Sequence, residues 1–381
     1  MDQEIQQPLA GDRLNETKAK AAVKRGTGFA ASEDLPGWVF IGEQGLRAGW
    51  AAAICYGLFR LFSVLVGSVF FATHLVGESA DFSATGVIFG ELISFLAMIG
   101  AVLLMAVIEG RNPLEYNLMG PRRVRHFFFG MGSGLVALSV LMGGLAAGGW
   151  LHFGAVALSG FAILKLGVLW GIAFLIVACV EEGLSRCYLQ FTLTHGINFW
   201  WALGTIGVVC GDLLLRGKGN GIWGVYGLAL LGVAPCALLH FRKAEGAGFW
   251  QAAWVTSTLF GFIHTGNNGE NWIGIFAAAA IGFVFCVSVR FTGSAWWAIG
   301  FHAAWDWGET YFYGSADSGN VATGHYLSTS PAGSAFWSGG TDGPEGSVLI
   351  IPLLILVTGA IVAVYGRREA AEPAALKRVT G

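Results

Sequence analysis

Charged side chains are scarce in this sequence: Asp, Glu, Lys and Arg make up 12% of its 381 residues, whereas 55% are hydrophobic. A soluble domain is usually about one quarter charged, so an ordinary soluble protein is excluded. The apolar residues gather in several nearly uncharged runs of roughly 18 residues or more, which is typical of membrane-spanning helices. We therefore expect an all-α fold, a polytopic transmembrane helical bundle with about 8–10 spans.

Paired cysteines are also missing. The six cysteines lie in largely apolar segments without CxxC or other paired spacing, so we interpret them as small buried hydrophobic residues. Cys179 and Cys187 lie close to two glutamates, but these are weak candidates for the helper base of a thiol nucleophile, and a catalytic cysteine is not favoured. The net charge of −2 says nothing about partners, and no nucleic-acid partner is expected.

The first residues are polar and lack the apolar stretch of a signal peptide. We expect a cytoplasmic polar tail over 1–46, a multi-pass membrane domain over 47–366 and a second cytoplasmic tail over 367–381. Within the membrane domain, the segment 160–312 carries the ionisable motifs, and 313–346 forms an outer loop.

Ten segments are candidate spans, of which the fifth and sixth are the least certain because both are short. They are 50–75, 86–108, 127–149, 164–189, 198–215, 223–241, 250–266, 271–289, 294–312 and 347–366. Glycine is abundant, with 58 residues, and GMGSG (130–134) and GGLAAGG (143–149) are expected to let helices approach closely.

Lysine and arginine are absent from two connections, residues 78–84 and the long segment 313–346. Most of the other connections and both tails carry them, and the positive-inside rule places such segments in the cytoplasm. We therefore expect a cell-membrane protein with both termini cytoplasmic, to which Lys165, Arg216 and Lys218 are exceptions. The segment 313–346 is rich in Gly and Ser, which fits either a cap or a disordered connector.

The first group of ionisable residues is Glu181, Glu182 and Arg186, which follow fifteen uncharged residues. Each such group costs about 2.5–3.5 kcal/mol to insert into a membrane, so it is a functional candidate. Glu182 and Arg186 are four residues apart on a helix and can pair. Glu181 is rotated by about 100° and is free to act as a base. The alternative is a helix end whose charges reach the lipid headgroups.

Two further motifs place ionisable residues on one helix face each. Phe260 and His264 are four residues apart, and so are His302 and Asp306. Either histidine alone could equally be a hydrogen-bonding residue between helices. Isolated charges are assigned structural or interfacial roles; they are Arg60, Glu91, Asp212 and Glu309.

The depth of these groups in the membrane offers a further comparison. Helix rise puts Glu181 about 8 Å below the cytoplasmic boundary and His302 about 12 Å from the same side. His264 reaches a similar depth only if 244–253 lies at the membrane surface and 254–266 forms a short or partial span. This arrangement is our prediction.

EExxxR, FxxxH and HxxxD, in this order on separate helices, resemble the CPBP family of CAAX proteases and bacteriocin-processing enzymes, also called the Abi family. These are intramembrane glutamic endopeptidases, and the eukaryotic Ras-converting CAAX endopeptidase is a member. The resemblance covers about 160–312. It implies cleavage near the C-terminus of a peptide or membrane-anchored protein substrate in the lipid bilayer.

The resemblance also implies roles for the residues. Glu181 would be the general base that activates a water, with help from His264. Glu182 would support it, and Arg186 would position the carboxylates.

On the opposite side, the resemblance implies that His302 and residue 306 stabilise the oxyanion. Much of the family has HxxxN, whereas this chain has Asp306, which can donate a hydrogen bond only when protonated. We favour Asp306 as an acceptor that orients His302, because their spacing allows contact.

Two other interpretations stay open. Zinc accepts carboxylate and imidazole ligands, which Glu181, Glu182, His264 and His302 supply, but no HExxH is present and no cofactor is expected. The protein could also be a non-catalytic bacteriocin-immunity or scaffold protein, or a transporter with an acidic site in the membrane.

Overall fold

The structure is a computed structural model that describes residues 40–42, 45–75, 82–197, 199–215, 222–267, 269 and 271–366. Most of the two predicted tails, part of the connection 78–84, and Arg216 with Lys218 lie outside the described residues. The division into a membrane domain and two tails therefore stays a prediction.

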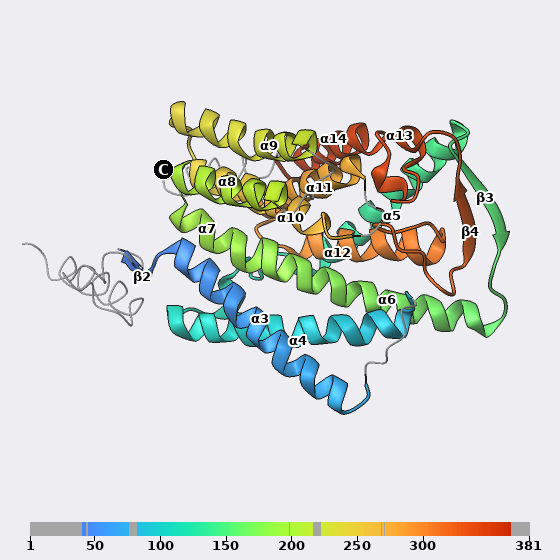
Figure 1. Cartoon of the computed structure of the whole chain (residues 1–381), viewed down its shortest axis with the longest axis horizontal. Helices are drawn as coiled ribbons and strands as arrows, with labels where there is room; N and C mark the ends of the chain where they lie inside the picture. Colours follow the sequence, from blue (N-terminus) through green and yellow to red (C-terminus); the bar gives the residue numbers. More distant parts are fainter. Residues whose placement is uncertain are drawn as a thin grey trace, which may run out of the picture.

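Helices make up most of the described chain, and they lie side by side along the long axis of the molecule (Figure 1). All ten predicted spans are helical, and the all-α bundle is confirmed. The helices are α3 (Ala48–Ala72), α4 (Ala84–Glu109), α5 (Arg123–Ala147), α6 (Phe161–Glu182), α7 (Gln190–Gly196), α8 (Phe199–Leu215), α9 (Ile222–Phe241), α10 (Ala247–His264), α11 (Trp272–Thr292), α12 (Trp296–Asp306) and α14 (Ile350–Ile361).

Shorter elements connect or extend these helices. They are β1 (Ile41–Gly42), β2 (Gly45–Leu46), β3 (Leu151–Val156), β4 (Leu327–Pro331), α13 (Ala335–Ser338), the 3₁₀ turns η1 (Pro113–Glu115) and η4 (Pro344–Gly346), and the π-helical turns η2 (Gly183–Leu189), η3 (Trp307–Phe312) and η5 (Val362–Gly366). The turn η2 joins α6 to α7, so one continuous helix runs over 161–196.

Five of the described helices are long and apolar enough to cross a membrane: α3, α4, α5, the continuous helix 161–196 and α11. Three more are apolar but shorter, and two of these correspond to α8 and to most of α9. Large hydrophobic side chains such as Val64, Phe71, Val107 and Val136 are exposed. An apolar exterior of this kind is stable in lipid and is a liability in water.

The starts of several helices meet the ends of others at one end of the bundle. The Tyr188 hydroxyl donates to Ala51 O, and Trp296 Nε1 donates to Leu118 O at 3.0 Å. Tyr365 at the end of the last helix packs against His126 near the start of α5. The β3–β4 ribbon lies at the opposite end (Figure 1). The first and last described helices thus begin and end on the same side, as predicted; which side is cytoplasmic stays a prediction.

Glycine brings α5 and α12 into backbone contact. A Cβ atom at Gly130 would collide with Trp297 O, and one at Gly134 would collide with the backbone of Phe301. The prediction of close approach at 130–134 is therefore confirmed. It is wrong for 143–149, because the glycines at its start face open space and Gly148 meets only a nearby side chain.

The long segment 313–346 is folded, so the disordered connector is excluded. Its strand β4 pairs antiparallel with β3, with Leu151 opposite Pro331 and Phe153 opposite Thr329. The rest of the segment contacts the start of α11, where the backbone N–H of Asn271 donates a hydrogen bond to Asp342 Oδ2.

The predicted division into a surface segment, 244–253, and a short or partial span, 254–266, does not appear as a break in the helix. Helix α10 begins at Ala247 and continues without interruption to His264, and residues 251–253 are buried in the bundle. Packing on the neighbouring helices stabilises these first residues of α10, 247–253, which form about two turns.

Candidate active site

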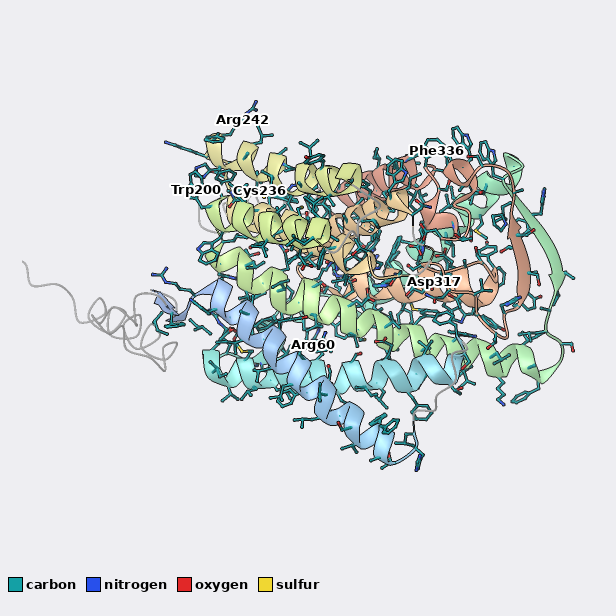
Figure 2. All side chains as sticks on the ribbon, in the orientation of Figure 1. Arg60, Trp200, Cys236, Arg242, Asp317 and Phe336 are labelled. Atoms are coloured by element: carbon teal, nitrogen blue, oxygen red, sulfur yellow. The ribbon has the colours of Figure 1, made fainter. Side chains whose placement is uncertain are left out.

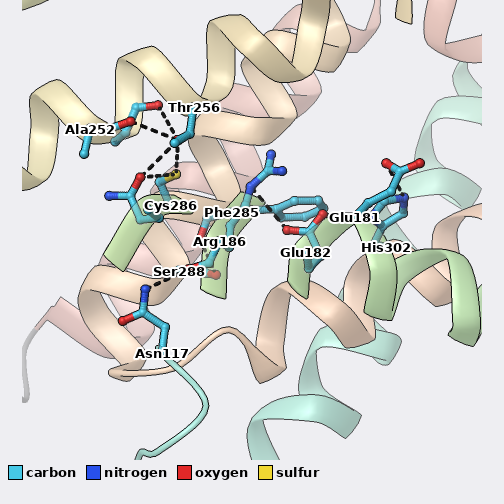
Figure 3. A network of polar contacts seen from close by, with 12 residues as sticks. Asn117, Glu181, Glu182, Arg186, Ala252, Thr256, Phe285, Cys286, Ser288 and His302 are labelled. Atoms are coloured by element: carbon cyan, nitrogen blue, oxygen red, sulfur yellow. Dashed lines mark hydrogen bonds and ion pairs between the residues drawn. The ribbon is translucent and has the colours of Figure 1, made fainter. Parts of the chain in front are cut away.

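Glu182 joins the first motif to the third. Its Oε2 forms a 3.2 Å ion pair with Arg186 Nε, and neither side chain is exposed. Its Oε1 accepts a hydrogen bond from His302 Nδ1 at 2.9 Å. Figure 3 shows Glu182 facing Arg186, with Glu181 beside His302. The predicted pairing of Glu182 with Arg186 is confirmed.

Arg186 also joins the second motif to the first. Its guanidinium carbon lies 4.2 Å from the centre of the Phe260 ring and 5.5 Å from that of Phe285. A cation over an aromatic face is attracted by the ring quadrupole, most strongly where water is excluded. Gly282 makes room, because a Cβ there would crowd the guanidinium. Arg186 is therefore held by one carboxylate and two rings.

A π-helical turn begins within the first motif and another directly after the third. The turn η2 starts directly after Glu182, and η3 starts directly after Asp306. Such turns are rare and occur frequently at functional sites, because they change the direction of the side chains that follow. The first turn also continues the helix to Gly196, about 22 Å beyond Glu181. Glu181 thus lies further from the helix end than the sequence predicted.

His302 has a carboxylate on each side of its ring. Besides the bond from Nδ1 to Glu182, Nε2 lies 3.4 Å from Asp306 Oδ2 and 3.9 Å from Glu181 Oε2. The ring stacks on Phe285 with centroids 5.8 Å apart. The predicted contact between Asp306 and His302 is present.

His264 presents one ring nitrogen to the site. Its Nδ1 lies 2.7 Å from Phe260 O, and a carbonyl oxygen accepts only, so Nδ1 carries the proton. A neutral ring with this tautomer leaves Nε2 as an acceptor. The side chain is partly buried and lines the same cavity as Glu181.

A cavity of about 330 Å³ connects these groups. Its wall contains four of the six predicted site residues, namely Glu181, His264, His302 and Asp306, whereas Glu182 and Arg186 lie behind them. The Glu181 side chain is 29% exposed and that of Glu182 is 0% exposed. Adjacent glutamates therefore occupy unlike environments, as predicted. The size is typical of sites for small molecules or peptides.

The outer segment covers part of this cavity. Asp317, Ser318, Asn320 and Glu345 belong to its lining, together with apolar side chains of α4, α6, α11 and α14. The segment 313–346 therefore acts as a cap, the first of the two predicted possibilities.

Sequence reasoning missed two supporting residues. Glu91, assigned a structural role, lines the cavity. Gln190, fully buried, accepts hydrogen bonds from Thr256 and Cys286 and donates to Phe249 O, which ties the first-motif helix to α10 and α11. Its position four residues after Arg186 is the signal that could have identified it.

The residues considered for zinc do not form a compact set. In the described part of the chain, one trio of His, Cys, Asp or Glu residues has ligand atoms all within 4.8 Å of one another, and it contains none of the four zinc candidates. It consists of Glu309, Asp317 and Glu345.

Comparison with known proteins supports the resemblance. Residues 163–308 match the family model described as type II CAAX prenyl endopeptidase Rce1-like. The match begins near the start of α6 and ends just after the third motif, so it contains all six candidate residues. Searches of curated proteins and of solved structures found no match.

Proposed function

We propose that this protein is an intramembrane endopeptidase. The ground is that residues 163–308 match the family model of Rce1-like type II CAAX prenyl endopeptidases. The enzyme hydrolyses a peptide bond near the C-terminus of a membrane-anchored protein, with a water that Glu181 activates. The protein lies in the cell membrane with both termini in the cytoplasm.

The observation that carries the proposal is the contrast between the two adjacent glutamates. Glu182 is fully buried and held by Arg186 and His302, so it has no access to a substrate. Glu181 faces the cavity, where a water and a peptide carbonyl have room. A carboxylate in this position takes a proton from the water as the water attacks.

His264 assists from the cavity wall. Its Nε2 is an acceptor because Nδ1 donates to Phe260 O, so it can accept the second hydrogen of the water that Glu181 deprotonates. Two acceptors on one water fix its orientation, and a fixed nucleophile lowers the entropic part of the barrier.

His302 faces the charge that develops on the substrate carbonyl. A ring with protons on both nitrogens satisfies the contacts to Glu182 and Asp306 together, because each carboxylate only accepts. Such a ring, held in place before the reaction, stabilises the negative tetrahedral oxygen. Asp306 thus orients His302 rather than donating to the oxyanion itself.

The reaction then balances in two steps. Water adds to the carbonyl carbon and its proton passes to Glu181. The C–N bond breaks as Glu181 returns this proton to the leaving amine, which gives an amine and a carboxylic acid and restores the ionised glutamate. The acid then loses its proton to the amine or to water. Arg186 contacts neither substrate nor water; it positions Glu182 and, through it, His302.

Mass spectrometry of cleavage products tests the proposal. The purified full-length protein in detergent is incubated with peptides that end in a CAAX sequence, with the cysteine farnesylated, geranylgeranylated or unmodified. Release of a C-terminal tripeptide from a prenylated peptide is the expected result. A zinc-selective chelator that spares Ca²⁺ and Mg²⁺ leaves the rate unchanged if glutamate and water suffice.

The non-catalytic alternative gives the opposite result. If the polar cluster only holds helices together, no peptide is cleaved and Glu181→Gln leaves the cellular phenotype of the protein intact, whereas unchanged folding of this variant is expected in both cases.

A further inference from the structure

A second cluster of carboxylates lies at the β3–β4 end of the bundle. Glu309 belongs to the turn η3, Asp317 to the first part of the cap, and Glu345 to the turn η4. Their ligand atoms all lie within 4.8 Å of one another. Asp317 is in the half of the molecule that carries the ribbon, far from Arg242 (Figure 2). Three parts of the chain thus bring three acids together.

Glu309 is the residue that points to a ligand. Its side chain is 0% exposed, and neither of its carboxylate oxygens has a hydrogen-bond partner among the described residues. The Trp305 side chain faces it, but outside normal hydrogen-bond geometry. A buried carboxylate without a partner is costly, because nothing replaces the water that it loses.

Among the described residues, the charged groups that act most strongly on Glu309 include no positive side chain, whereas His302 acts on Asp317. The charged groups that act on Glu309 are Glu345, Asp317 and Asp306, all of them acidic. The sequence of the cap, residues 313–346, contains no Lys or Arg. Its single histidine, His325, binds Ala322 O and Ser328 instead. A cation from solution would supply the missing charge.

The surroundings also match a cation site. Thr310 Oγ1 donates to Asp317 Oδ2 at 2.7 Å, and the backbone N–H of Ser318 donates to Glu345 Oε1 at 3.1 Å. Carboxylates that bind metals are usually oriented by such outer hydrogen bonds. Gly343 has φ of 119°, and a Cβ there would collide with Ala316 O and lie 3.1 Å from Glu309 Oε1, so glycine lets the backbone of the cap approach this carboxylate closely.

We propose that Glu309, Asp317 and Glu345 bind one hard divalent cation, Ca²⁺ or Mg²⁺, which fastens the cap to the end of the α12 helix. Both ions prefer carboxylate and carbonyl oxygens, whereas zinc and copper favour nitrogen or sulfur. Asp317 and Glu345 also line the catalytic cavity, so the bound ion fixes the part of its wall that the cap supplies. The site is distinct from the proposed catalytic residues.

Terbium luminescence tests the site without any measurement of proteolysis. Tb³⁺ substitutes for Ca²⁺, and Trp305 beside Glu309 sensitises its emission. Tb³⁺ is titrated into the full-length protein in detergent, and Ca²⁺ or Mg²⁺ is then added as competitor. We expect Tb³⁺ to bind at one saturable site per chain and to be displaced by Ca²⁺, by Mg²⁺ or by both. The melting temperature of the protein should rise as the concentration of the competing ion increases.

Isosteric variants assign the site. Glu309→Gln and Asp317→Asn each weaken Tb³⁺ binding by about tenfold or more, because each removes a charged ligand. Asp342→Asn is the matched control: it changes a fully buried acid of the cap that is not in the cluster, and it leaves Tb³⁺ binding unchanged. If Glu309→Gln does not fold, Asp317→Asn and Glu345→Gln provide the same comparison. Absence of a saturable site, or equal binding by the folded cluster variants and wild type, overturns the proposal.

Discussion

The ion pair between Glu182 and Arg186 makes a quantitative prediction. Both side chains are 0% exposed, so no water can replace a lost partner. Removal of one partner from a buried pair costs about 3–5 kcal/mol, because the other charge stays buried and uncompensated. At roughly 2 °C per kcal/mol for a large domain, Arg186→Met lowers the melting temperature by about 6–10 °C.

The double variant measures the interaction energy between Glu182 and Arg186 separately from the effect of each single substitution. Glu182→Gln with Arg186→Met removes both charges, and replacement of a whole buried pair by neutral groups is often neutral. The glutamine oxygen can still accept from His302 Nδ1. We therefore expect a double variant that is more stable than Arg186→Met alone, with a coupling energy of about 3 kcal/mol or more.

Differential scanning fluorimetry in detergent measures all four proteins of this cycle. Arg111→Met is the control, because Arg111 is 31% exposed and pairs with Glu109 and Glu115 near the surface. It should change stability by about 1 kcal/mol or less. Additive effects of the two buried substitutions, or a shift by Arg186→Met no larger than that of the control, would refute the reasoning.

Three further predictions concern other parts of the molecule. Asp306→Asn retains cleavage within about tenfold, because the amide oxygen still accepts from His302, whereas Asp306→Ala loses about 100-fold or more; equal rates of peptide release by the two variants contradict the orienting role. Gly130→Val destabilises the protein by about 1–3 kcal/mol or more through collision with the backbone of α12, whereas Gly132→Val, which faces open space, has little effect on the melting temperature. Burial raises the pKa of Asp342 to about 7, so the folded state favours the protonated acid. Wild type therefore loses stability as the pH rises from about 4 to 7, and a melting-temperature profile of Asp342→Asn that falls equally steeply argues against this assignment.

Local spacing explains why so much of the site could be predicted from the sequence. Glu182 with Arg186, Phe260 with His264, and His302 with Asp306 are each four residues apart, and helix geometry alone brings such pairs together. Hydrophobic runs long enough for a membrane predicted the ten helices in the same way.

Contacts between distant segments account for what was not predicted. The assignment of Glu91 to a structural role used only its isolation in the sequence, whereas its place in the cavity depends on how α4 packs beside α6. The π-helical turns and the start of α10 at Ala247 result from tertiary packing, which overrides local pattern. The cap has a composition typical of a loop, and only its pairing with β3 shows that it is folded.

The most direct test of the account is the turnover number of Glu181→Gln on a peptide that the wild type cleaves, with Glu91→Gln, which alters another carboxylate of the same cavity, as control. The account predicts that Glu181→Gln folds with an unchanged melting temperature and loses about 100- to 10,000-fold in kcat, whereas Glu91→Gln stays within about tenfold. Cleavage by Glu181→Gln at a rate within tenfold of wild type would contradict the claim that Glu181 activates the water.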